Sequence, residues 1–555
     1  MTPVPRPRWL LHCVITWAAV LVAYSVQAQT EPAQRTQIPF GPYRIAGTVV
    51  SAKGGNPLAR ARVTIADAKR RQSMQSMVTG DDGRYEFHVP AGKYSLDGDK
   101  RGFISASYDQ HDQFSTAIVT GIGLDTENLV LRLAPNAVLT GKVLDEFGEP
   151  VRDARIIVYR ENHFQGVSRI TRYRDAATDD EGRYEVTPLD AGTYFVAAKT
   201  SPWYAIHPDT NTLGASLAAP AQVDSSLDVV YPITYYGDAT EADDATPIPV
   251  RGGDRLEADI HLNPVPSLHV IVHTADDGSQ GVNLPMLQKK AFDGLDQVES
   301  SNIQMISPGV FEINGLAAGR YSVRMPDGNG QMKEPTEVNL SGGSELDVST
   351  GNSTGTIKAT VQIEGAAMIP AQLQIALRNR KGRMNATQVD AKGEAVFTDV
   401  IPGNYEIVAN TSTQPYSIVR ITSEAGTVNG HGLNVAPGAQ LNLVLKLVGS
   451  SVTVEGFAKR AGKALAGAMI VLVPKNPEEN LDRFRRDQGD LDGSFSLPSV
   501  IPGSYTILAI DDGWDLDWSQ PGVLAGYLGR GQAVDIGDRS PTTVYLPATV
   551  EVQAK

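Results

Sequence analysis

The chain has 555 residues, which is too many for one hydrophobic core and predicts roughly three to five domains. Acidic residues outnumber basic ones, 63 Asp and Glu against 49 Lys and Arg. No run of Lys or Arg is long enough to neutralise a phosphate backbone, which argues against nucleic-acid binding. A hydrophobic content of 41% argues against a chain that is disordered throughout.

The first 28 residues have the pattern of a Sec signal peptide. Arg6 and Arg8 precede an apolar run at 9–24, and residues 26–28 (VQA) have the small side chains that a signal peptidase reads. Cleavage is therefore expected after Ala28, and the mature chain is expected to be secreted, periplasmic or at the cell surface, without a transmembrane segment. The alternative is that the apolar run stays as an anchor, although it is a little short for a membrane span.

The only cysteine of the chain, Cys13, lies inside this segment. The mature chain would then have no disulfide, no thiolate metal site and no cysteine nucleophile. Each domain would have to be stabilised by its hydrophobic core alone.

A motif of two glycines, nine or ten residues apart, recurs five times after this segment. The first glycine follows an acidic or polar turn and should take a positive φ, while a preceding Asp accepts backbone hydrogen bonds. An aromatic residue two positions later should fill the core; Ala395 breaks this rule, so Phe397 is expected to fill that core instead. A tyrosine follows every second glycine and is expected to be a core residue. The aromatic positions are Tyr85, Tyr184, Phe311 and Phe495, and the tyrosines are Tyr94, Tyr194, Tyr321, Tyr405 and Tyr505.

Short strands with alternating apolar and polar residues flank each copy, with Gly, Pro, Asp and Asn between them. This pattern predicts an all-β chain of tandem antiparallel β-sandwiches, because alternation places one face of a sheet in the core and the other in water. The expected organisation is a linker at 29–42 and β-sandwiches at 43–135, 136–266, 267–351, 352–449 and 450–555. The third and fourth are degenerate copies.

The motif is clearest at 141–156 (GKVLDEFGEPVRDARI), 178–184 (TDDEGRY) and 189–194 (LDAGTY). Together these segments resemble the carboxypeptidase regulatory-like domain. The first unit is a good match and the fifth a fair one. The resemblance implies a prealbumin-like, or transthyretin-like, seven-stranded β-sandwich that is related in shape to carbohydrate-binding domains. It also implies an exported bacterial repeat protein, as in acidobacteria, and brings no catalytic residue with it.

The chain is not expected to be an enzyme. None of its nine histidines has the Glu spacing of a zinc carboxypeptidase, and neither a G-x-S-x-G motif nor a phosphate-binding glycine loop occurs. His269 and His273 are expected to share one strand face, too far apart for one metal ion. No catalytic residue, metal or cofactor is therefore expected. The acidic segments 81–82, 97–99, 179–181 and 490–493 offer too few oxygens for calcium.

Aromatic residues in the loops are candidates for stacking on sugar rings. Trp514 and Trp518 have the same parity on an expected strand and could form a flat strip. The alternative is that the loop aromatics seal the ends of the sandwiches or the joints between domains. The candidate carbohydrate-binding residues are Trp203, Tyr204, Tyr235, Tyr236, Trp514 and Trp518.

The sequence thus predicts a non-enzymatic exported protein with a structural or binding role at the cell surface or in the periplasm. Its units should lie like beads, with contacts between neighbours, and carbohydrate is the first ligand class to test. Expected partners are a polysaccharide or another cell-envelope component, or an exported protein. Two alternatives are an accessory or regulatory subunit of an exported peptidase system and an adhesin stiffened by calcium.

Overall fold

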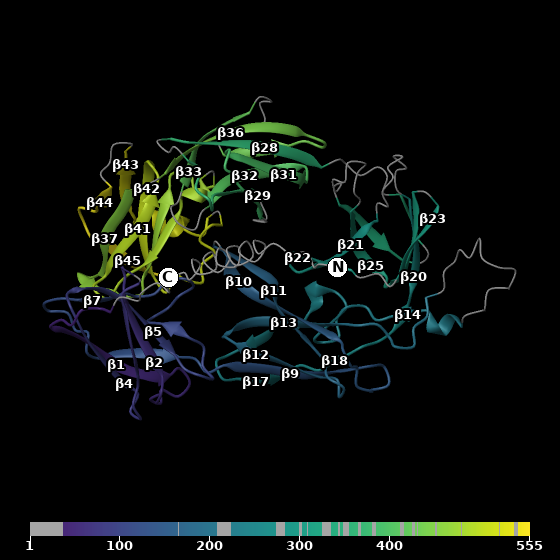
Figure 1. The fold of residues 1–555 in the computed structure, drawn as a ribbon, viewed down its shortest axis with the longest axis horizontal. Helices are drawn as coiled ribbons and strands as arrows, with labels where there is room; N and C mark the ends of the chain where they lie inside the picture. Colours follow the sequence, from purple (N-terminus) through teal and green to yellow (C-terminus); the bar gives the residue numbers. More distant parts are fainter. Residues whose placement is uncertain are drawn as a thin grey trace, which may run out of the picture.

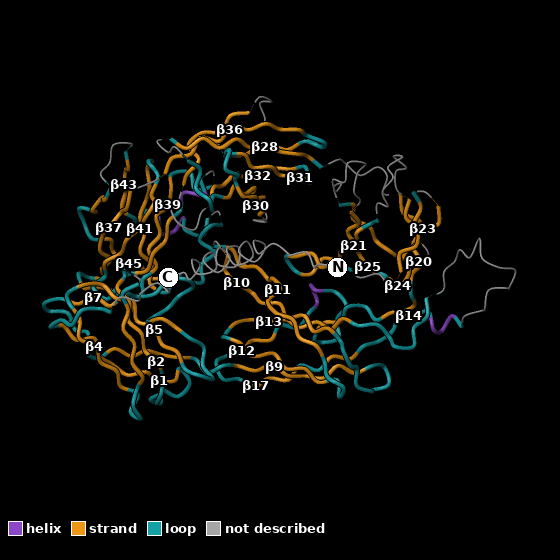
Figure 2. The backbone as a smooth tube through the Cα atoms, in the orientation of Figure 1, coloured by secondary structure: helices purple, strands orange, loops and turns teal. Residues whose placement is uncertain are grey.

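A computed structural model describes most of the chain beyond residue 36. The expected signal peptide and most of the expected linker lie outside the described residues. Strands and loops make up nearly all of the described chain, together with one short helix, α2 (Ala525–Leu528), and three 3-10 turns (Figure 2). Within this part of the chain, no helix is both long and apolar enough to cross a membrane. The described residues are 37–70, 72–164, 166–207, 224–273, 284–298, 302–307, 309–324, 335–341, 344–347, 354–364, 368–379, 384–410, 416–423, 428–429, 431–449, 452–478, 480–520, 522–537 and 542–555.

Five hydrophobic cores divide these residues into units 1 to 5. The buried residues of each core come from one stretch of the chain: 38–133, 137–262, 268–340, 357–447 and 452–552. Each core lies between two sheets, so the chain is an all-β series of prealbumin-like sandwiches, as the sequence predicted. The residues at which each unit would end as an independent fold stay a prediction.

Unit 1 packs a sheet of order β4-β1-β8 against one of order β3-β2-β5-β6, in which β7 also pairs with β5. Its strands are β1 (Tyr43–Ser51), β2 (Arg62–Asp67), β3 (Met74–Val78), β4 (Arg84–Val89), β5 (Gly92–Asp99), β6 (Ala106–Ser107), β7 (Ile118–Thr120) and β8 (Leu129–Leu133).

Unit 2 has a sheet of order β12-β9-β17, with β18 also on β9, and one of order β11-β10-β13-β15, with β16 also on β13; β14 and β19 form a separate pair. The strands are β9 (Ala137–Leu144), β10 (Arg155–Phe164), β11 (Val167–Ala177), β12 (Arg183–Leu189), β13 (Gly192–Lys199), β14 (Val229–Val230), β15 (Thr234–Tyr235), β16 (Ile248–Val250), β17 (Arg255–Glu257), β18 (Ile260–His261) and β19 (Val265–Pro266). Two 3-10 turns, η1 (Ser225–Leu227) and η2 (Ala242–Asp244), lie in its loops.

Units 3 and 4 keep two sheets each although their motifs are degenerate. The sheet orders are β23-β24-β20-β27 and β22-β21-β25-β26 in unit 3, and β31-β28-β36-β33 and β30-β29-β32-β35-β34 in unit 4. Unit 3 contains β20 (Leu268–His273), β21 (Met286–Ala291), β22 (Gly294–Gln297), β23 (Asn302–Ser307), β24 (Val310–Leu316), β25 (Gly319–Arg324), β26 (Thr336–Leu340) and β27 (Ser344–Asp347). Unit 4 contains β28 (Gly355–Ile363), β29 (Gln374–Asn379), β30 (Met384–Gln388), β31 (Glu394–Val400), β32 (Gly403–Asn410), β33 (Tyr416–Ser423), β34 (Val428–Asn429), β35 (Gly432–Val435) and β36 (Gln440–Gly449).

The two layers of unit 5 are continuous, because β45 pairs with β37 at one end and with β42 at the other. The sheet order is β38-β37-β45-β42-β39-β40, with β41 and β44 also on β37 and β43 on β42. The elements are β37 (Val452–Arg460), β38 (Lys463–Ala464), β39 (Met469–Pro474), η3 (Leu481–Arg483), β40 (Arg485–Gln488), β41 (Ser494–Val500), β42 (Gly503–Asp511), β43 (Gln532–Ile536), β44 (Thr543–Tyr545) and β45 (Val550–Ala554).

Each unit contains a parallel pairing that the antiparallel prediction did not include. The first strand of the unit lies parallel to strands near its end: β1 to β8, β9 to β17 and β18, β20 to β27, β28 to β36, and β37 to β44 and β45. A parallel pair needs a connection that crosses over, which here is the intervening sheet of the sandwich. Alternation of apolar and polar residues reports which face is buried and says nothing about strand direction.

The repeated turn has the predicted geometry. The Asp179 carboxylate accepts hydrogen bonds from the backbone N–H of Glu181 and of Arg183, at 2.9 and 2.8 Å. Gly182 has a φ of 71°, and a Cβ at this position would lie 2.7 Å from the carbonyl oxygen of Val143. Only glycine satisfies both conditions without strain. The first glycines of the other copies also have positive φ: Gly83, Gly309, Gly393 and Gly493.

The aromatic residues after these turns lie in the cores, as predicted. In unit 4, Phe397 and Ala395 are both buried members of one core. The buried residues of the other units are Tyr85, Tyr184, Phe311 and Phe495.

The tyrosine after each second glycine makes the same hydrogen bond in all five units. Its hydroxyl donates to the carbonyl oxygen four residues earlier, so one side chain closes the corner before its own strand. The bonds run from Tyr94 to Pro90 (3.1 Å), Tyr194 to Asp190 (3.1 Å), Tyr321 to Ala317 (2.7 Å), Tyr405 to Ile401 (2.7 Å) and Tyr505 to Ile501 (2.7 Å). A tyrosine corner is also a hallmark of other β-sandwich folds.

Replacing Tyr505 with Phe should lower the free energy of unfolding of unit 5 by about 1 kcal/mol, because the carbonyl oxygen of Ile501 loses its buried donor. Hydrogen exchange of the β42 amides measures this loss. Tyr545→Phe is the matched control, because Tyr545 is 72% exposed. Equal exchange rates in both variants would contradict a stabilising role of the corner.

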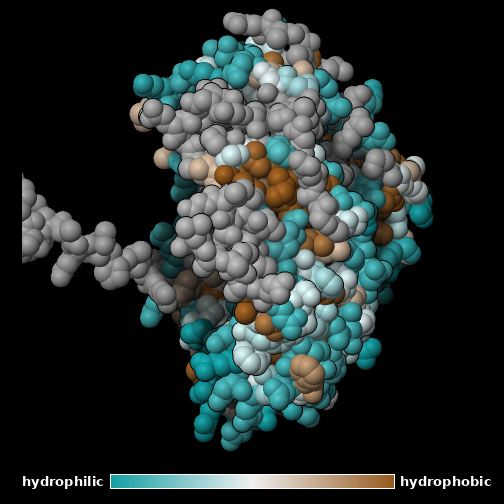
Figure 3. All heavy atoms as spheres, turned by 90° about the vertical axis from the view of Figure 1, so that its right-hand side faces the viewer, coloured by the Kyte–Doolittle hydropathy of each residue, from teal (hydrophilic) through white to brown (hydrophobic). Residues whose placement is uncertain are grey.

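The units form a ring rather than a row of beads. In Figure 1, units 1 and 2 lie along the bottom, unit 3 lies at the right, unit 4 at the top and unit 5 at the left, above unit 1. Unit 5 bonds to unit 1 through Asp490 and Lys93, and to unit 2 through Asp517 and Ser168. The sequence predicted contacts between neighbours in the chain, and the structure adds contacts of unit 5 with units 1 and 2. On the face shown in Figure 3, hydrophilic residues cover most of the described surface, and hydrophobic residues form small groups.

Candidate functional site

The outer face of the β3-β2-β5-β6 sheet of unit 1 carries a groove of about 460 Å³. The alternation of the strands creates it. On β2, Val63 and Ile65 point into the core, so Arg62 and Thr64 point outward. On β5, Leu96 points inward, which places Asp97 and Asp99 on the outer face. The polar lining residues are Arg62, Thr64, Ser76, Asp97, Asp99, Ser105, Ser107 and Gln110.

The two carboxylates in the groove are held by their neighbours. Asp99 accepts a hydrogen bond from the Arg62 guanidinium and another from the Ser105 hydroxyl, both at 2.8 Å. Asp97 accepts hydrogen bonds from the hydroxyls of Ser107 and Ser95. Because an ionised carboxylate has about four acceptor positions, each Asp can still accept hydrogen bonds from a ligand.

These groups recognise hydroxyls. A polyhydroxylated ligand can donate to Asp97 and Asp99 and accept from the remaining N–H groups of Arg62. The Ser105 and Ser107 hydroxyls give their single hydrogens to the two carboxylates, so toward a ligand they can only accept. Two carboxylates and one guanidinium leave a net negative charge, which favours a neutral ligand over an anionic one. The lining residues of the groove include no aromatic ring, so binding here would rest on hydrogen bonds.

Trp203 and Tyr204 lie at one end of unit 2. Trp203 is 88% exposed, and its ring meets that of Tyr204 edge-on at 5.8 Å. The hydroxyls of Tyr204 and Tyr231 both donate to the carboxylate of Glu146. Burial opposes ionisation of Glu146, but the two tyrosine hydroxyls outweigh it and lower the pKa of this carboxyl. Trp203 therefore presents a ring to solvent beside a fixed carboxylate.

Tyr235 is buried and Tyr236 is partly buried. Tyr235 is 1% exposed, and its ring contacts Phe292 of unit 3 at 5.7 Å. Tyr236 packs against the core of unit 2. Tyr235 thus seals the joint between units 2 and 3, which is the alternative that the sequence left open.

The expected strand through Trp514 and Trp518 is wrong, because residues 512–520 form turns. Trp514 is 8% exposed and stacks on His111 of unit 1, with ring centroids 5.2 Å apart. Trp518 contacts Phe484 at 5.2 Å and lies against Gly166 of unit 2. The two rings do not form a flat strip, because each packs in a joint with a different unit.

The six candidate residues are therefore not gathered into one site. Carbohydrate binding by them stays a prediction, and of the six it is Trp203 whose ring is most open to solvent. From the sequence, Asp97 and Asp99 were interpreted only as an acidic segment with too few oxygens for calcium, and not as part of a groove. Nothing in their spacing indicates that β2, β3 and β6 surround them with a guanidinium and hydroxyls.

The joint between units 2 and 3 holds a polar network that the sequence did not suggest. Asp228 bonds His207 through one oxygen at 3.0 Å and His269 through the other at 2.6 Å. His269 also bonds Glu312, which is fully buried, at 3.3 Å. Burial opposes the charged imidazole, but the two carboxylates prevail and raise the pKa of His269. These residues share no motif, so no sequence signal could have joined them.

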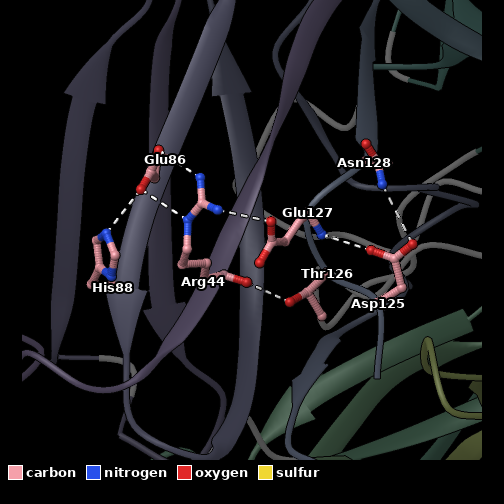
Figure 4. Close-up of polar contacts among 7 residues, drawn as sticks. All are labelled: Arg44, Glu86, His88, Asp125, Thr126, Glu127 and Asn128. Atoms are coloured by element: carbon pink, nitrogen blue, oxygen red, sulfur yellow. Dashed lines mark hydrogen bonds and ion pairs between the residues drawn. The ribbon is translucent and has the colours of Figure 1, made fainter. Parts of the chain in front are cut away.

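A second polar cluster, on β1 and β4, is a surface feature. Arg44 pairs with Glu86 at 3.0 Å and with Glu127 at 2.8 Å, and His88 bonds Glu86 Oε1, the oxygen that also accepts from Arg44 Nε (Figure 4). All these side chains are more than a third exposed, so water screens the pairs and each contributes little to stability. Among the described residues, no group of three or more His, Cys, Asp or Glu has the geometry to hold a metal ion.

Residues 44–121 match the family model described as the carboxypeptidase regulatory-like domain. The resemblance inferred from the sequence is thus confirmed for unit 1, whereas the segments that carried it most clearly lie in unit 2, beyond the match.

Curated relatives include the human "BOS complex subunit NOMO3", 25% identical over 228 residues, which are 36% of this chain and 18% of the relative. The mouse "BOS complex subunit NOMO1" is 24% identical over the same shares. The chain spans about a fifth of the length of these relatives.

Solved structures with a detectable likeness include the Bacillus anthracis TIE protein, at 12% identity and a TM-score of 0.17, covering 80% of this chain and 79% of that one. Another is GBS52, the minor pilin of Streptococcus agalactiae, at 13% identity and a TM-score of 0.21, covering 40% and 97%. Scores this low support no inference about this chain.

Proposed function

We propose that the chain is an exported, non-enzymatic protein with a structural and binding role at the cell surface or in the periplasm. Its ring of β-sandwiches is the structural part, and the groove of unit 1 is a binding site for a neutral carbohydrate. The observation that carries the proposal is the pair of carboxylates, Asp97 and Asp99, held in place by Arg62 and serine hydroxyls on the floor of the groove.

Two features support the choice of carbohydrate. Charged groups that already have hydrogen-bond partners lose little conformational freedom on binding, so the groove is preorganised for hydroxyls. The groove also lies within the residues that match the carboxypeptidase regulatory-like domain, and the fold implied by that family is related to carbohydrate-binding domains. The export of the chain rests on the signal-peptide pattern of residues 1–28.

The calcium-stiffened adhesin is not favoured. The carboxylate of Asp490, which belongs to the acidic segment 490–493, bonds Lys93, the backbone N–H of Ala117 and the Ser494 hydroxyl. A lysine ammonium at 2.6 Å takes the place that a cation would need.

Binding of the full chain to an immobilised panel of neutral oligosaccharides tests the proposal. Asp97→Asn and Asp99→Asn should each weaken retention at least tenfold, since a bond to a charged acceptor contributes about 1.5–3 kcal/mol. Glu181→Gln, in the exposed turn of unit 2, is the matched control and should retain full binding. Retention that survives both Asp variants but is lost in Trp203→Ala would place the site on unit 2. If retention is lost neither in the two Asp variants nor in Trp203→Ala, the carbohydrate site is refuted and only the structural role remains.

A further inference from the structure

The turn at 488–494 of unit 5 is seated on unit 1. Leu491 at its tip packs against the core of unit 1, and its backbone N–H donates to the carbonyl oxygen of Ala117 at 3.1 Å. The backbone N–H of Ala117 donates in return to the carboxylate of Asp490 at 3.0 Å. We call the contact between the 488–494 turn and its partners on unit 1 the closing contact, because it joins the first unit to the last (Figure 1).

Lys93 provides the charge of the closing contact on unit 1. Its ammonium donates to Asp490 at 2.6 Å and to the Ser494 hydroxyl at 2.8 Å. The Asp490 side chain is mostly buried in this position. The site on unit 1 therefore selects a carboxylate at this position, because removing either Lys93 or Asp490 would leave the other charge without compensation.

Gln488 adds a second polar anchor. Its amide N–H group donates to the carbonyl oxygen of Asp109 at 2.6 Å and to the Thr116 hydroxyl at 2.8 Å, while its oxygen meets His111 at 3.2 Å. Gln488 is 1% exposed and Thr116 is fully buried. Every polar atom of the Gln488 amide therefore has a partner on unit 1.

The stacked rings beside these anchors extend the contact. Trp514 of unit 5 lies on His111 and Phe114 of unit 1, and the guanidinium of Arg486 lies 5.3 Å from the Phe114 ring. Arg486 also pairs with Asp112 at 3.4 Å. An apolar anchor, an ion pair and desolvated hydrogen bonds together are the composition of a specific protein interface.

The closing contact is heterologous, since a turn on unit 5 meets a different surface on unit 1. The 488–494 turn and its site on unit 1 therefore fit each other whether they belong to one chain or to two copies of it. Within one chain they meet because the other units hold them close, which acts as a high effective concentration. Two copies whose rings are open offer the same two surfaces to each other.

We infer that the closing contact is a releasable docking contact and that a second copy of this chain can supply the 488–494 turn. Opened chains then join head to tail, unit 5 of one copy on unit 1 of the next. The site on unit 1 takes an acidic turn that presents a glutamine amide, a carboxylate and a leucine in the order Q-G-D-L. The inference does not rest on the carbohydrate groove, because the residues that line the groove differ from those of the closing contact, although Lys93 lies on the same face of β5 as Asp97.

Two full-length variants test this by complementation. Lys93→Glu removes the donating cation on unit 1 and leaves the turn intact, whereas Asp490→Lys removes the accepting carboxylate of the turn and leaves unit 1 intact. Each alone should be a monomer with a larger radius of gyration by small-angle scattering, because its ring is open. Their equimolar mixture should form a dimer by light scattering, since the intact turn of one meets the intact site of the other.

Lys69→Glu and Asp535→Lys, at exposed positions of units 1 and 5, are the matched control pair and should stay closed monomers alone and mixed. A mixture that stays monomeric although both test variants have opened overturns the inference. Unchanged radii of both test variants also overturn it, because the contact is then not releasable. If circular dichroism shows that a charge reversal prevents folding, the milder pair Lys93→Met and Asp490→Asn repeats the same comparison.

Discussion

Replacing Phe292 with Ala should weaken the joint between units 2 and 3 by about 3–5 kcal/mol, the usual cost of removing a buried phenylalanine ring. Phe292 lies in the turn between β21 and β22 of unit 3 and is 8% exposed. Its ring inserts into unit 2, with centroids 5.0 Å from Tyr159, 4.7 Å from Phe195 and 5.7 Å from Tyr235. Losing it would leave a cavity lined by three aromatic rings.

Polar contacts around the ring explain why the cavity could not simply close. The hydroxyl of Tyr159 donates to Asp296, and the backbone N–H of Ile170 donates to Asp293 at 2.8 Å. Lys289 pairs with Glu241 at 3.0 Å. These bonds tie β21, β22 and the turn between them to β10, β11 and the residue before η2, so relaxation is limited and the full cavity cost is expected.

Hydrogen exchange at β10 and β21, with limited proteolysis of the joint, measures the effect. Phe147→Ala is the matched control, because the Phe147 ring is largely exposed. Phe292 has a φ of 52°, so Phe292→Gly should be less harmful than Phe292→Ala by about 1 kcal/mol. Equal protection in Phe292→Ala and Phe147→Ala would falsify the assignment of this ring to the joint.

Unit 5 should become less stable as the pH rises from 4 to 7, because of Asp487 on β40. Burial raises the pKa of this carboxyl from 3.8 to about 6, against hydrogen bonds from the backbone N–H groups of Ser496 and Gln488 that favour its charged form. The nearby charge of Asp490 raises the pKa of Asp487 further, whereas the charge of Lys93 lowers it. Burial also raises the pKa of Asp490, so both groups act in the same direction.

The sign follows from proton binding. Between pH 3.8 and about 6 the folded state holds a proton on Asp487 that the unfolded state has lost, so the free energy of unfolding falls as the pH rises through this range. Above about pH 6 Asp487 is charged in the folded state as well, so the full free-energy cost of burying this charge is present. A pKa shift of about two units corresponds to a cost of at most about 3 kcal/mol. Acid therefore stabilises unit 5 in this window, opposite to the usual effect of a salt-bridged carboxylate.

Asp487→Asn should flatten this pH dependence and stabilise unit 5 at pH 7, because the amide oxygen still accepts from Ser496 and no charge is buried. Hydrogen exchange of the β39 and β42 amides between pH 4 and 8, corrected for the intrinsic exchange rate, checks it. Asp535→Asn, at an exposed position of β43, should leave the slope unchanged. A slope that persists in Asp487→Asn would assign the dependence to another group.

Much of the fold could be predicted because its signals are local. A glycine that must take a positive φ, such as Gly182, and an aromatic residue two positions later, such as Tyr184, are read within five residues of sequence. In the structure, alternation on β2 places Val63 and Ile65 in the core and Arg62 and Thr64 outside. The hydrogen bond of each tyrosine corner spans four residues, yet the sequence indicated only that the tyrosine lies in the core.

The candidate site could be predicted only in part. Asp97 and Asp99 stand out as acidic residues, but their chemistry depends on Arg62 and Ser105, which reach them from other strands. Trp203 was predicted among the exposed aromatics, whereas Tyr235 and Trp514 proved to be buried against other units. An aromatic residue in a loop has the same local pattern whether water or a neighbouring domain covers it.

The sequence by itself determined the repeat, the all-β class, the turn geometry and the burial of the motif's aromatic residues, because each depends on residues close together in the chain. Only the tertiary structure decided which strands run parallel, that Phe292 enters unit 2, that His207 and His269 share Asp228, and that Asp490 reaches Lys93 across the ring. Each of these depends on the packing of surfaces whose residues are tens to hundreds of positions apart. Periodicity carries no information about which surfaces meet.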